Sequence, residues 1–425
     1  MLQYIKNLFG MKNLILFFPF ALLSIKILGN FLLLLILLIG IKKYFVDNYR
    51  PLKIKETKMI SILSLIYFFV MLASIILNSG FDEDMRHIFR KLHFFLLPLI
   101  SLAFIDVEID LKKILKAFKI SLICLGLIVS IETILAYFLH TNILGGRVET
   151  SIIGESRYTG MINANVFGDL VVVIFFMSIV RIFDENRREL LLTFVSSSLG
   201  LWTIFLSGSR GSWVTFTVLM LIFIFFKFKK LSYSVKNQKL FLTGLGIFLI
   251  VFGLMFIPKV LTKFEQTSNA VNYWKFNHET YSSAGIRLEM WSSALDAFKD
   301  APWYGYGYRL ANSKVSEYAS DHAETIAAFT HLHNEYITAL LSAGITGLAS
   351  LLFLLFIPMV YFYKSRHIEE NYYFSIMGII LTLGYSVSGL THMSFGEEHL
   401  NAFFVFYIIL LIQCLKKDKT VKKLG

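Results

Sequence analysis

Stretches of about twenty apolar residues recur along almost the whole chain, and this repetition limits the possible folds more than any other feature. A helix needs about 20 apolar residues to cross a hydrocarbon layer about 30 Å thick. We count about twelve such stretches, the first two of which also fit a single re-entrant hairpin. They lie near residues 12–28, 30–45, 59–77, 88–105, 114–139, 162–183, 189–206, 212–228, 239–257, 335–362, 372–391 and 399–415. The sequence therefore predicts an all-α integral membrane protein with about twelve transmembrane helices.

Basic residues gather in every second gap between these stretches, whereas the other gaps are polar or acidic. Short loops rich in lysine and arginine stay on the cytoplasmic side of a membrane. The alternation therefore predicts cytoplasmic termini, and it accounts for most of the net charge of +12 without a nucleic-acid partner. Only 16% of the residues are charged, against about 25% in soluble domains, which excludes an ordinary soluble protein. The basic clusters contain Lys42, Lys43, Arg50, Lys53, Lys55 and Lys58; Lys112, Lys113 and Lys116; Arg181, Arg187 and Arg188; Lys227, Lys229, Lys230, Lys236 and Lys239; Lys364 and Arg366; and Lys416, Lys417, Lys419, Lys422 and Lys423.

Neither the cysteines nor the N-terminus indicates processing of the chain. Cys124 and Cys414 both lie in apolar stretches, so no disulfide framework is expected. The first apolar stretch lacks a small-residue cleavage site and leads into another such stretch, so we expect a retained helix rather than a removed signal peptide.

One outer gap is far longer than the others, and it divides the chain into three parts. We expect helices one to nine in residues 1–258, an outer loop domain in 259–332, and helices ten to twelve with a basic tail in 333–425. Within the loop, apolar residues at helical spacing predict an amphipathic helix over 286–298 that Pro302 ends. A loop this long is usually functional or disordered, and its aromatic content favours an ordered cap.

Arg210 is the first candidate site residue, in the Ser-Gly-Ser-Arg-Gly-Ser-Trp segment at 207–213 on the outer side. Guanidinium binds phosphate oxygens bidentately and keeps its charge at any physiological pH. Glycines and serines beside a helix N-terminus also favour an anion site. The alternative is an interfacial arginine whose side chain extends to lipid headgroups.

Arg287 is the second candidate, within the amphipathic helix of the outer loop. Its neighbours Ile286 and Leu288, with Trp291 one turn later, indicate that it points toward the membrane surface. A solvated position on the polar face of the same helix fits the sequence equally well.

His331 and His333 precede the tenth helix in the segment His-Leu-His-Asn-Glu-Tyr. Their two-residue spacing, with Glu335 alone nearby, matches no recognised metal-ligand set, so we expect no metal. A histidine with a pKa near 6.5 can act as a general base at neutral pH. The alternative is a histidine that caps the helix.

Several charged residues stand on the outer side against the general pattern. Arg86, Arg90 and Lys91 follow the acidic segment 82–84, so they either pair with those acids or bind an anionic lipid. Arg147 lies in a second outer gap and is a further candidate for a substrate contact. The tyrosines of the Tyr-Gly-Tyr-Gly-Tyr segment at 304–308 suit sugar stacking or the membrane interface.

Taken in order, these motifs resemble the O-antigen ligase family of bacterial membrane glycosyltransferases, within the ligase and polymerase superfamily. The resemblance rests on the segment 207–213, on Arg287 with Trp291, on Pro302 before the Gly-Tyr-Gly turn, and on the His-Asn-Glu-Tyr segment at 333–336 with Gly344 and Gly347 downstream. It implies a GT-C-like fold of about twelve helices with a large periplasmic loop in the bacterial inner membrane.

The resemblance also implies an activity. The donor would be O-antigen linked to undecaprenyl pyrophosphate, and the acceptor a sugar hydroxyl of lipid A-core. Arg210 and Arg287 would hold the pyrophosphate, His333 would be the general base, and His331 would have a supporting role. No metal or cofactor is implied, and direct attack by the acceptor hydroxyl predicts inversion at the anomeric carbon. Arg86, Arg90 and Lys91 would contact acceptor phosphates.

Other functions remain open at this point. An O-antigen polymerase uses the same donor with a second lipid-linked glycan as acceptor, and a pilin or teichuronic-type ligase uses yet another acceptor. A transporter or flippase would need ionisable residues within helices and an internal repeat. The sparse charges inside the helices, mainly Lys26, Glu132 and Asp169, favour the enzyme. A purely structural scaffold would not need candidate residues that face one side.

Overall fold

The computed structural model is helical apart from one short antiparallel pair of strands. It describes residues 10–24, 27–78, 85–105, 107–139, 148–150, 156–158, 163–230, 261–262, 265–275, 283–320, 323–329 and 331–416. Strand β1 (Val148–Thr150) pairs with β2 (Ser156–Tyr158), with Glu149 opposite Arg157. The predicted helical class is thus confirmed in its coarse form.

Eleven of the twelve predicted apolar stretches coincide with a helix, and the stretch 239–257 lies outside the described residues. The helices are α2 (Met11–Ser24), α3 (Leu28–Phe45), α4 (Lys55–Asn78), α5 (Met85–Ala103), α6 (Leu111–Leu139), α7 (Ala164–Ser178), α8 (Arg187–Ser207), α9 (Arg210–Lys230), α14 (Glu335–Ser365), α15 (Tyr372–Ser388) and α16 (Glu398–Gln413). By length and apolar composition, six described segments can cross a membrane: α3, α4, α6, α8, α14 and Ala164–Asp184, which contains α7. The chain therefore has the helices of a membrane protein.

The chain forms two compact units. One consists of Met1–Phe69, Arg86–Leu221 and Ala349–Gly425, and the other of Val70–Met85 and Ile222–Leu348. Three helices, α4, α9 and α14, contribute residues to both units.

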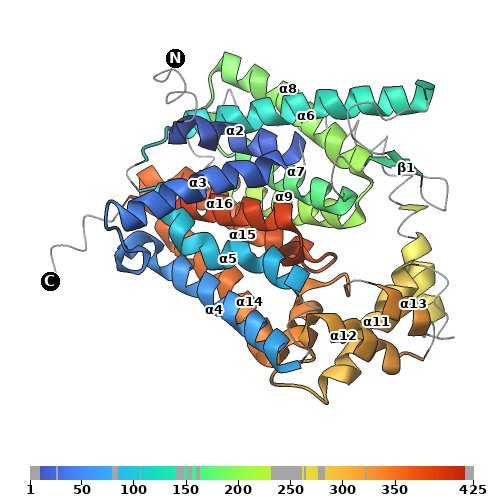
Figure 1. Cartoon of the computed structure of the whole chain (residues 1–425). Coiled ribbons are helices and arrows are strands. Elements are labelled where there is room, and N and C mark those ends of the chain that lie inside the picture. Colours follow the sequence, from blue (N-terminus) through green and yellow to red (C-terminus); the bar gives the residue numbers. More distant parts are fainter. Residues whose placement is uncertain are drawn as a thin grey trace. The chain divides into compact units, whose positions relative to one another are not determined.

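The centre of the first unit is built around α7 and α16, which are buried along nearly their whole length. A helix that is apolar on all sides must be surrounded by other helices. Helix α16 accordingly contacts α2, α3, α7 and α15 (Figure 1). The ring of Phe18 in α2 stacks on Phe406 in α16 with 3.9 Å between centroids.

Helices α6 and α8 lie side by side in the same unit (Figure 1). A Cβ atom on Gly126 of α6 would lie 2.6 Å from the Cβ of Leu199 in α8, so glycine allows the two helices to approach closely. Helix α8 begins with a capping box, in which the Asn186 side chain accepts the N–H of Glu189 and the Glu189 side chain accepts the N–H of Asn186.

The second unit has its own apolar core, formed mainly by α11 (Ser283–Phe298), α12 (Gly307–Glu317) and α13 (Ala323–Ala328). The amphipathic helix predicted at 286–298 is α11. It ends at Phe298 in a turn, so Pro302 does not end it. The buried core residues are Met290, Ala294, Ala297, Ala311, Val315, Ile326, Leu332 and Leu341.

Candidate functional site

Arg210 is the first residue of α9, and its side chain is exposed. Helix α8 ends at Ser207, and Gly208 follows in the left-handed conformation with φ 59°. The N–H of Gly208 donates to the Phe205 carbonyl at 2.9 Å. A glycine at this position reverses the chain without a Cβ penalty, so that two residues suffice to join α8 to α9.

The serines around Arg210 are bonded within the protein. Ser212 Oγ donates to the buried Asp169 carboxylate of α7 at 2.8 Å. Ser209 Oγ accepts the Ser212 N–H at 3.3 Å, while Ser207 Oγ donates to a carbonyl of its own helix at 2.7 Å. These hydroxyls hold the turn in place, and the exposed group that the turn presents is the Arg210 guanidinium.

Two glycines fix the start of α9 by close approach. A Cβ atom on Gly168 of α7 would lie 2.5 Å from Ser212 Oγ, and one on Gly211 would lie 2.3 Å from Thr391 Oγ1, just after α15. Larger residues at either position would displace the turn that carries Arg210. The small residues of this motif therefore position the turn.

Arg287 lies on α11, half-buried, one helical turn before Trp291. Residues four apart share a helix face, so Arg287 and Trp291 point to the same side of α11. The Trp291 indole N–H donates to the Leu332 carbonyl at 2.8 Å. That carbonyl stands between His331 and His333, so the face of α11 that carries Arg287 is joined to the histidine segment.

Glu289 is a buried support of this region that the sequence did not reveal. Its carboxylate accepts the Trp274 indole N–H at 2.8 Å. It also accepts the backbone N–H of Ser320 at 2.8 Å and the Ser320 hydroxyl at 2.7 Å. A carboxylate that is 4% exposed needs such donors, because a buried charge without partners is costly.

The imidazole rings of His331 and His333 lie together, with 4.3 Å between centroids. The Phe329 ring packs against His333 at 5.4 Å and 81°, edge to face. His333 has a φ of 51°, a left-handed conformation that is uncommon outside glycine but less rare for histidine. The backbone thus turns sharply at His333 before α14 begins.

Asn334, and not a histidine, caps α14. Its side-chain oxygen accepts the N–H groups of Tyr336 at 3.0 Å and Ile337 at 3.1 Å. Thr338 Oγ1 donates to the Asn334 carbonyl at 2.7 Å. The alternative that a histidine caps this helix is therefore wrong, and His333 is held at the residue before the cap.

Helix α14 is broken at Ala343 and Gly344, a feature that the sequence did not predict. The turn at Pro302–Tyr306 fills the break. The N–H of Ile345 donates to the Pro302 carbonyl and the N–H of Tyr306 to the Leu341 carbonyl, both at 2.8 Å. The first segment of α14, which follows His333, is thus fixed at both ends.

The tyrosines of the 304–308 segment have different environments. Tyr304 is 63% exposed, as is its neighbour Trp303 at 66%, whereas Tyr308 is buried. Tyr306 donates its hydroxyl to the Ala297 carbonyl at 2.8 Å, and burial raises its pKa. Of the three tyrosines proposed for sugar stacking, Tyr304 alone presents an exposed ring.

The other cations lie apart from these motifs in the sequence. The Lys91 ammonium is buried and donates to the Tyr67 hydroxyl at 2.8 Å and to the Phe395 carbonyl at 3.3 Å. Arg90 donates to the carbonyl of Gly396 at 3.4 Å. Both side chains thus support the segment before α16, and their predicted contact with acceptor phosphates stays a prediction. The Arg86 side chain and the whole of Arg147 lie outside the described residues.

The candidates fall into both units. Arg287, His331 and His333 belong to the second unit, where the Trp291–Leu332 hydrogen bond joins their segments. Arg210 belongs to the first unit. The predicted roles of all four residues stay predictions.

Comparison with known proteins identifies the family. Residues 195–352, which include Arg210, Arg287 and His333, match the family model described as O-antigen ligase. The chain belongs to the O-antigen ligase family. The resemblance recognised in the sequence motifs is thereby confirmed.

Similar proteins are consistent with this family. The chain is 27% identical over 383 residues to an uncharacterized protein of Haemophilus influenzae, covering 86% of this chain and 90% of that protein. It is 23% identical over 252 residues to an O-antigen ligase of Escherichia coli K12, covering 57% of this chain and 56% of the ligase. It is also 29% identical over 171 residues to a general O-oligosaccharyltransferase of Acinetobacter baylyi, covering 38% of this chain and 28% of that protein.

Proposed function

We propose that this member of the O-antigen ligase family transfers O-antigen from undecaprenyl pyrophosphate to a sugar hydroxyl of lipid A-core. The observation that carries the proposal is the family match over residues 195–352, because it contains every residue to which we give a chemical role. The similarity to an O-antigen ligase over 252 residues supports the same conclusion.

The proposal includes a topology. About twelve helices would cross the bacterial inner membrane in a GT-C-like fold, with cytoplasmic termini and a periplasmic loop domain at 259–332 between 1–258 and 333–425. Support comes from the coincidence of eleven predicted stretches with helices. The basic clusters in alternate gaps give the direction of insertion.

Arg210 and Arg287 hold the pyrophosphate of the donor in this proposal. Arg210 is exposed at the first turn of α9, a helix of 21 residues whose N-terminal end carries partial positive charge. Guanidinium and helix dipole therefore attract an anion together. Arg287 is half-buried on the α11 face that is bonded to the histidine segment.

His333 serves as the general base. It takes the proton from the acceptor hydroxyl while that oxygen forms a bond to the anomeric carbon and the bond from this carbon to the pyrophosphate oxygen breaks. Undecaprenyl pyrophosphate leaves with the electron pair, and the configuration inverts. The arginines stabilise the charge that develops on the leaving group, so the reaction needs no metal. His331 supports His333, which its ring contacts.

Complementation of a bacterial strain that lacks its own ligase tests the proposal. The wild-type chain should restore the long-chain lipopolysaccharide ladder, and His333→Ala should lower the transfer rate roughly 100-fold or more, the usual contribution of a general base. His367→Ala is the matched control, because His367 is an exposed histidine in a gap predicted to be cytoplasmic. Equal ladders from the two variants would refute the assigned base.

Lysine substitution tests the pyrophosphate contact. Arg210→Lys should lose most activity, because an ammonium cannot form the bidentate contact, whereas Arg187→Lys, at an exposed arginine of α8, should retain it. Full activity of Arg210→Lys would exclude the bidentate role. Loss of activity on chelation, with rescue by a divalent ion, would exclude the metal-free mechanism.

The similarity to a general O-oligosaccharyltransferase favours a second candidate, transfer of a glycan to a hydroxyl outside lipid A-core. If the wild-type chain restores no ladder, glycosylated proteins of the same strain should be analysed by mass spectrometry. A polymerase-deficient strain then separates both transfer reactions from polymerisation.

A further inference from the structure

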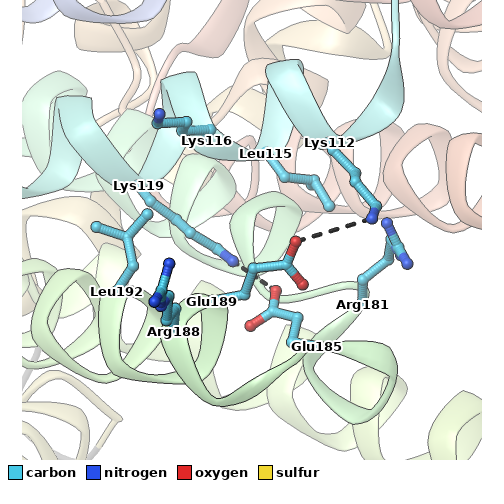
Figure 2. A pocket seen from close by; sticks show the side chains of 9 residues that line it. All are labelled: Lys112, Leu115, Lys116, Lys119, Arg181, Glu185, Arg188, Glu189 and Leu192. Carbon is cyan, nitrogen blue, oxygen red and sulfur yellow. Dashed lines mark hydrogen bonds and ion pairs between the residues drawn. The ribbon is translucent and has the colours of Figure 1, made fainter.

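A cavity of about 300 Å³ lies between α6, the segment after α7 and the start of α8, all within the first unit. It is lined by Lys112, Leu115, Lys116, Lys119, Arg181, Glu185, Arg188, Glu189 and Leu192 (Figure 2). Five lining residues are cations and two are carboxylates, so the lining has a formal excess of three positive charges. None of these residues takes part in the proposed transfer reaction.

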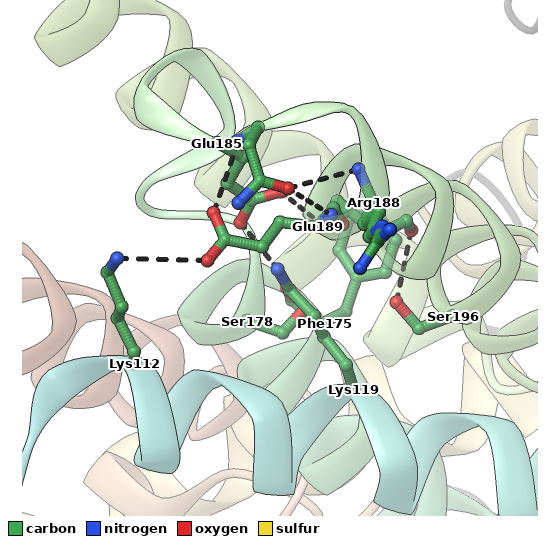
Figure 3. A network of polar contacts seen from close by, with 10 residues as sticks. Lys112, Lys119, Phe175, Ser178, Glu185, Arg188, Glu189 and Ser196 are labelled. Atoms are coloured by element: carbon green, nitrogen blue, oxygen red, sulfur yellow. Dashed lines mark hydrogen bonds and ion pairs between the residues drawn. The ribbon is translucent and has the colours of Figure 1, made fainter.

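Both carboxylates are already occupied by partners within the protein (Figure 3). Glu185 forms an ion pair with Lys119 at 2.5 Å, both side chains being less than 5% exposed, and accepts the Thr193 hydroxyl. Glu189 lies 3.9 Å from Lys112 and accepts the Asn186 N–H in the capping box of α8. The acids thus order the lining, and they are already matched by two of the five cations.

Three cations remain in excess. Within the described residues, no carboxylate lies in ion-pair distance of Lys116, Arg181 or Arg188. Lys116 and Arg188 are exposed, and Arg181 is half-buried with its guanidinium 5.7 Å from the ring centroid of Tyr373. Two guanidinium groups and an ammonium at one cavity favour a phosphate, which accepts several hydrogen bonds at once.

Apolar surface adjoins this basic cavity. Leu115 and Leu192 belong to its lining. Beyond the cavity, Ile120 of α6 is 45% exposed, and Leu191 and Phe194 of α8 are 65% and 66% exposed. Both helices are long and apolar enough to cross a membrane. A phosphate-binding cavity at the end of exposed apolar helix faces fits an amphiphile better than a free anion.

We propose that this cavity binds the phosphate headgroup of an anionic phospholipid, whose acyl chains cover the adjoining faces of α6 and α8. The cations belong to two clusters that the alternation of charge assigns to the cytoplasmic side, so the lipid belongs to the cytoplasmic leaflet. This site does not depend on the proposed ligase activity.

Lipid binding to the purified full chain in detergent tests the site. Native mass spectrometry should show phosphatidylglycerol retained in preference to phosphatidylcholine with the same acyl chains. Lys116→Gln with Arg188→Gln should weaken phosphatidylglycerol binding roughly 30-fold, about fivefold for each lost cation. Lys113→Gln with Arg187→Gln is the matched control, because it removes two exposed charges from the same helices outside the cavity lining.

The remaining arms separate the possible outcomes. Lys116→Arg with Arg188→Lys keeps both charges and should retain the lipid, which shows that loss in the glutamine variant is not unfolding. Equal weakening in both glutamine variants would mean nonspecific attraction to net charge and would overturn the proposal. Displacement of the lipid by millimolar inorganic phosphate or pyrophosphate would assign the cavity to a soluble anion instead.

Discussion

Replacing Gly344 with alanine tests whether the break in α14 depends on the Pro302–Tyr306 turn. Gly344 has φ 65° and ψ −159°, a region of backbone conformation that is open almost only to glycine. A Cβ atom there would lie 2.3 Å from the Trp303 carbonyl carbon and 2.6 Å from the Pro302 carbonyl oxygen. These are backbone atoms, so no side-chain rotation relieves the clash and the turn must move away from the helix.

The cost follows from two contributions. Alanine in this conformation is strained by about 1–3 kcal/mol. Displacing the turn also removes the hydrogen bonds from Tyr306 to Leu341 and from Ile345 to Pro302, each worth about 1 kcal/mol. Together these contributions lower the local stability by about 3–5 kcal/mol, a change of roughly 100-fold or more in the population of the open turn.

Hydrogen–deuterium exchange of the purified chain measures this opening directly. The amides of Tyr306 and Ile345 should exchange roughly 100-fold faster or more in Gly344→Ala than in the wild type. Gly200→Ala is the control, because a Cβ atom there meets the Phe175 ring at 3.3 Å, a contact that a small rotation relieves. Unchanged exchange in Gly344→Ala would refute the argument that the turn holds the break.

Three further predictions concern supporting contacts. Lys119→Met leaves the buried Glu185 carboxylate without its cation and should lower stability by about 3–5 kcal/mol in thermal unfolding, with partial recovery when Glu185→Gln is added. Asn334→Ala removes the cap of α14 and should cost about 1 kcal/mol, measured by faster amide exchange at the start of that helix, whereas Asn334→Asp should retain the cap. Trp291→Phe removes the indole donor to Leu332, worth about 1 kcal/mol, and should reduce the lipopolysaccharide ladder several-fold without abolishing it.

Each of these predictions has a contrary result. A Lys119→Met chain as stable as the double variant would show that the carboxylate is protonated or hydrated after the lysine is lost. Equal exchange in the alanine and aspartate variants of Asn334 would deny the cap any role. A normal ladder from Trp291→Phe would show that the α11 contact with Leu332 does not position the histidine segment.

The positions of the long helices follow from the sequence because a continuous apolar stretch is a local property. Helix α6 was predicted at 114–139 and extends over Leu111–Leu139, and α14 was predicted at 335–362 and extends over Glu335–Ser365. The amphipathic helix before Pro302 was found by its spacing in the same way. Its end was missed, since the turn after Phe298 is fixed by the contact of Pro302 and Tyr306 with α14.

The contacts of single polar residues do not follow from the sequence, because their partners are distant along the chain. Lys91 was interpreted as an outer cation, yet its partners Tyr67 and Phe395 come from helix α4 and from the segment before α16. Likewise Arg188 was one of a run of loop charges, and only the fold places it at a cavity with Lys116. The motif at Arg210 was recognised, but the bonds of its serines required the position of Asp169.

The burial of α16 has a consequence for biogenesis. Ribosomes make chains from the N-terminus, so α2, α3 and α7 leave the ribosome before the helix that they surround. Until α16 arrives, Phe18 and the other residues that pack against it have only lipid or one another as neighbours. A transcript that stops before Glu398 therefore produces a first unit with an empty centre, and membrane proteases that recognise loosely packed helices should remove it.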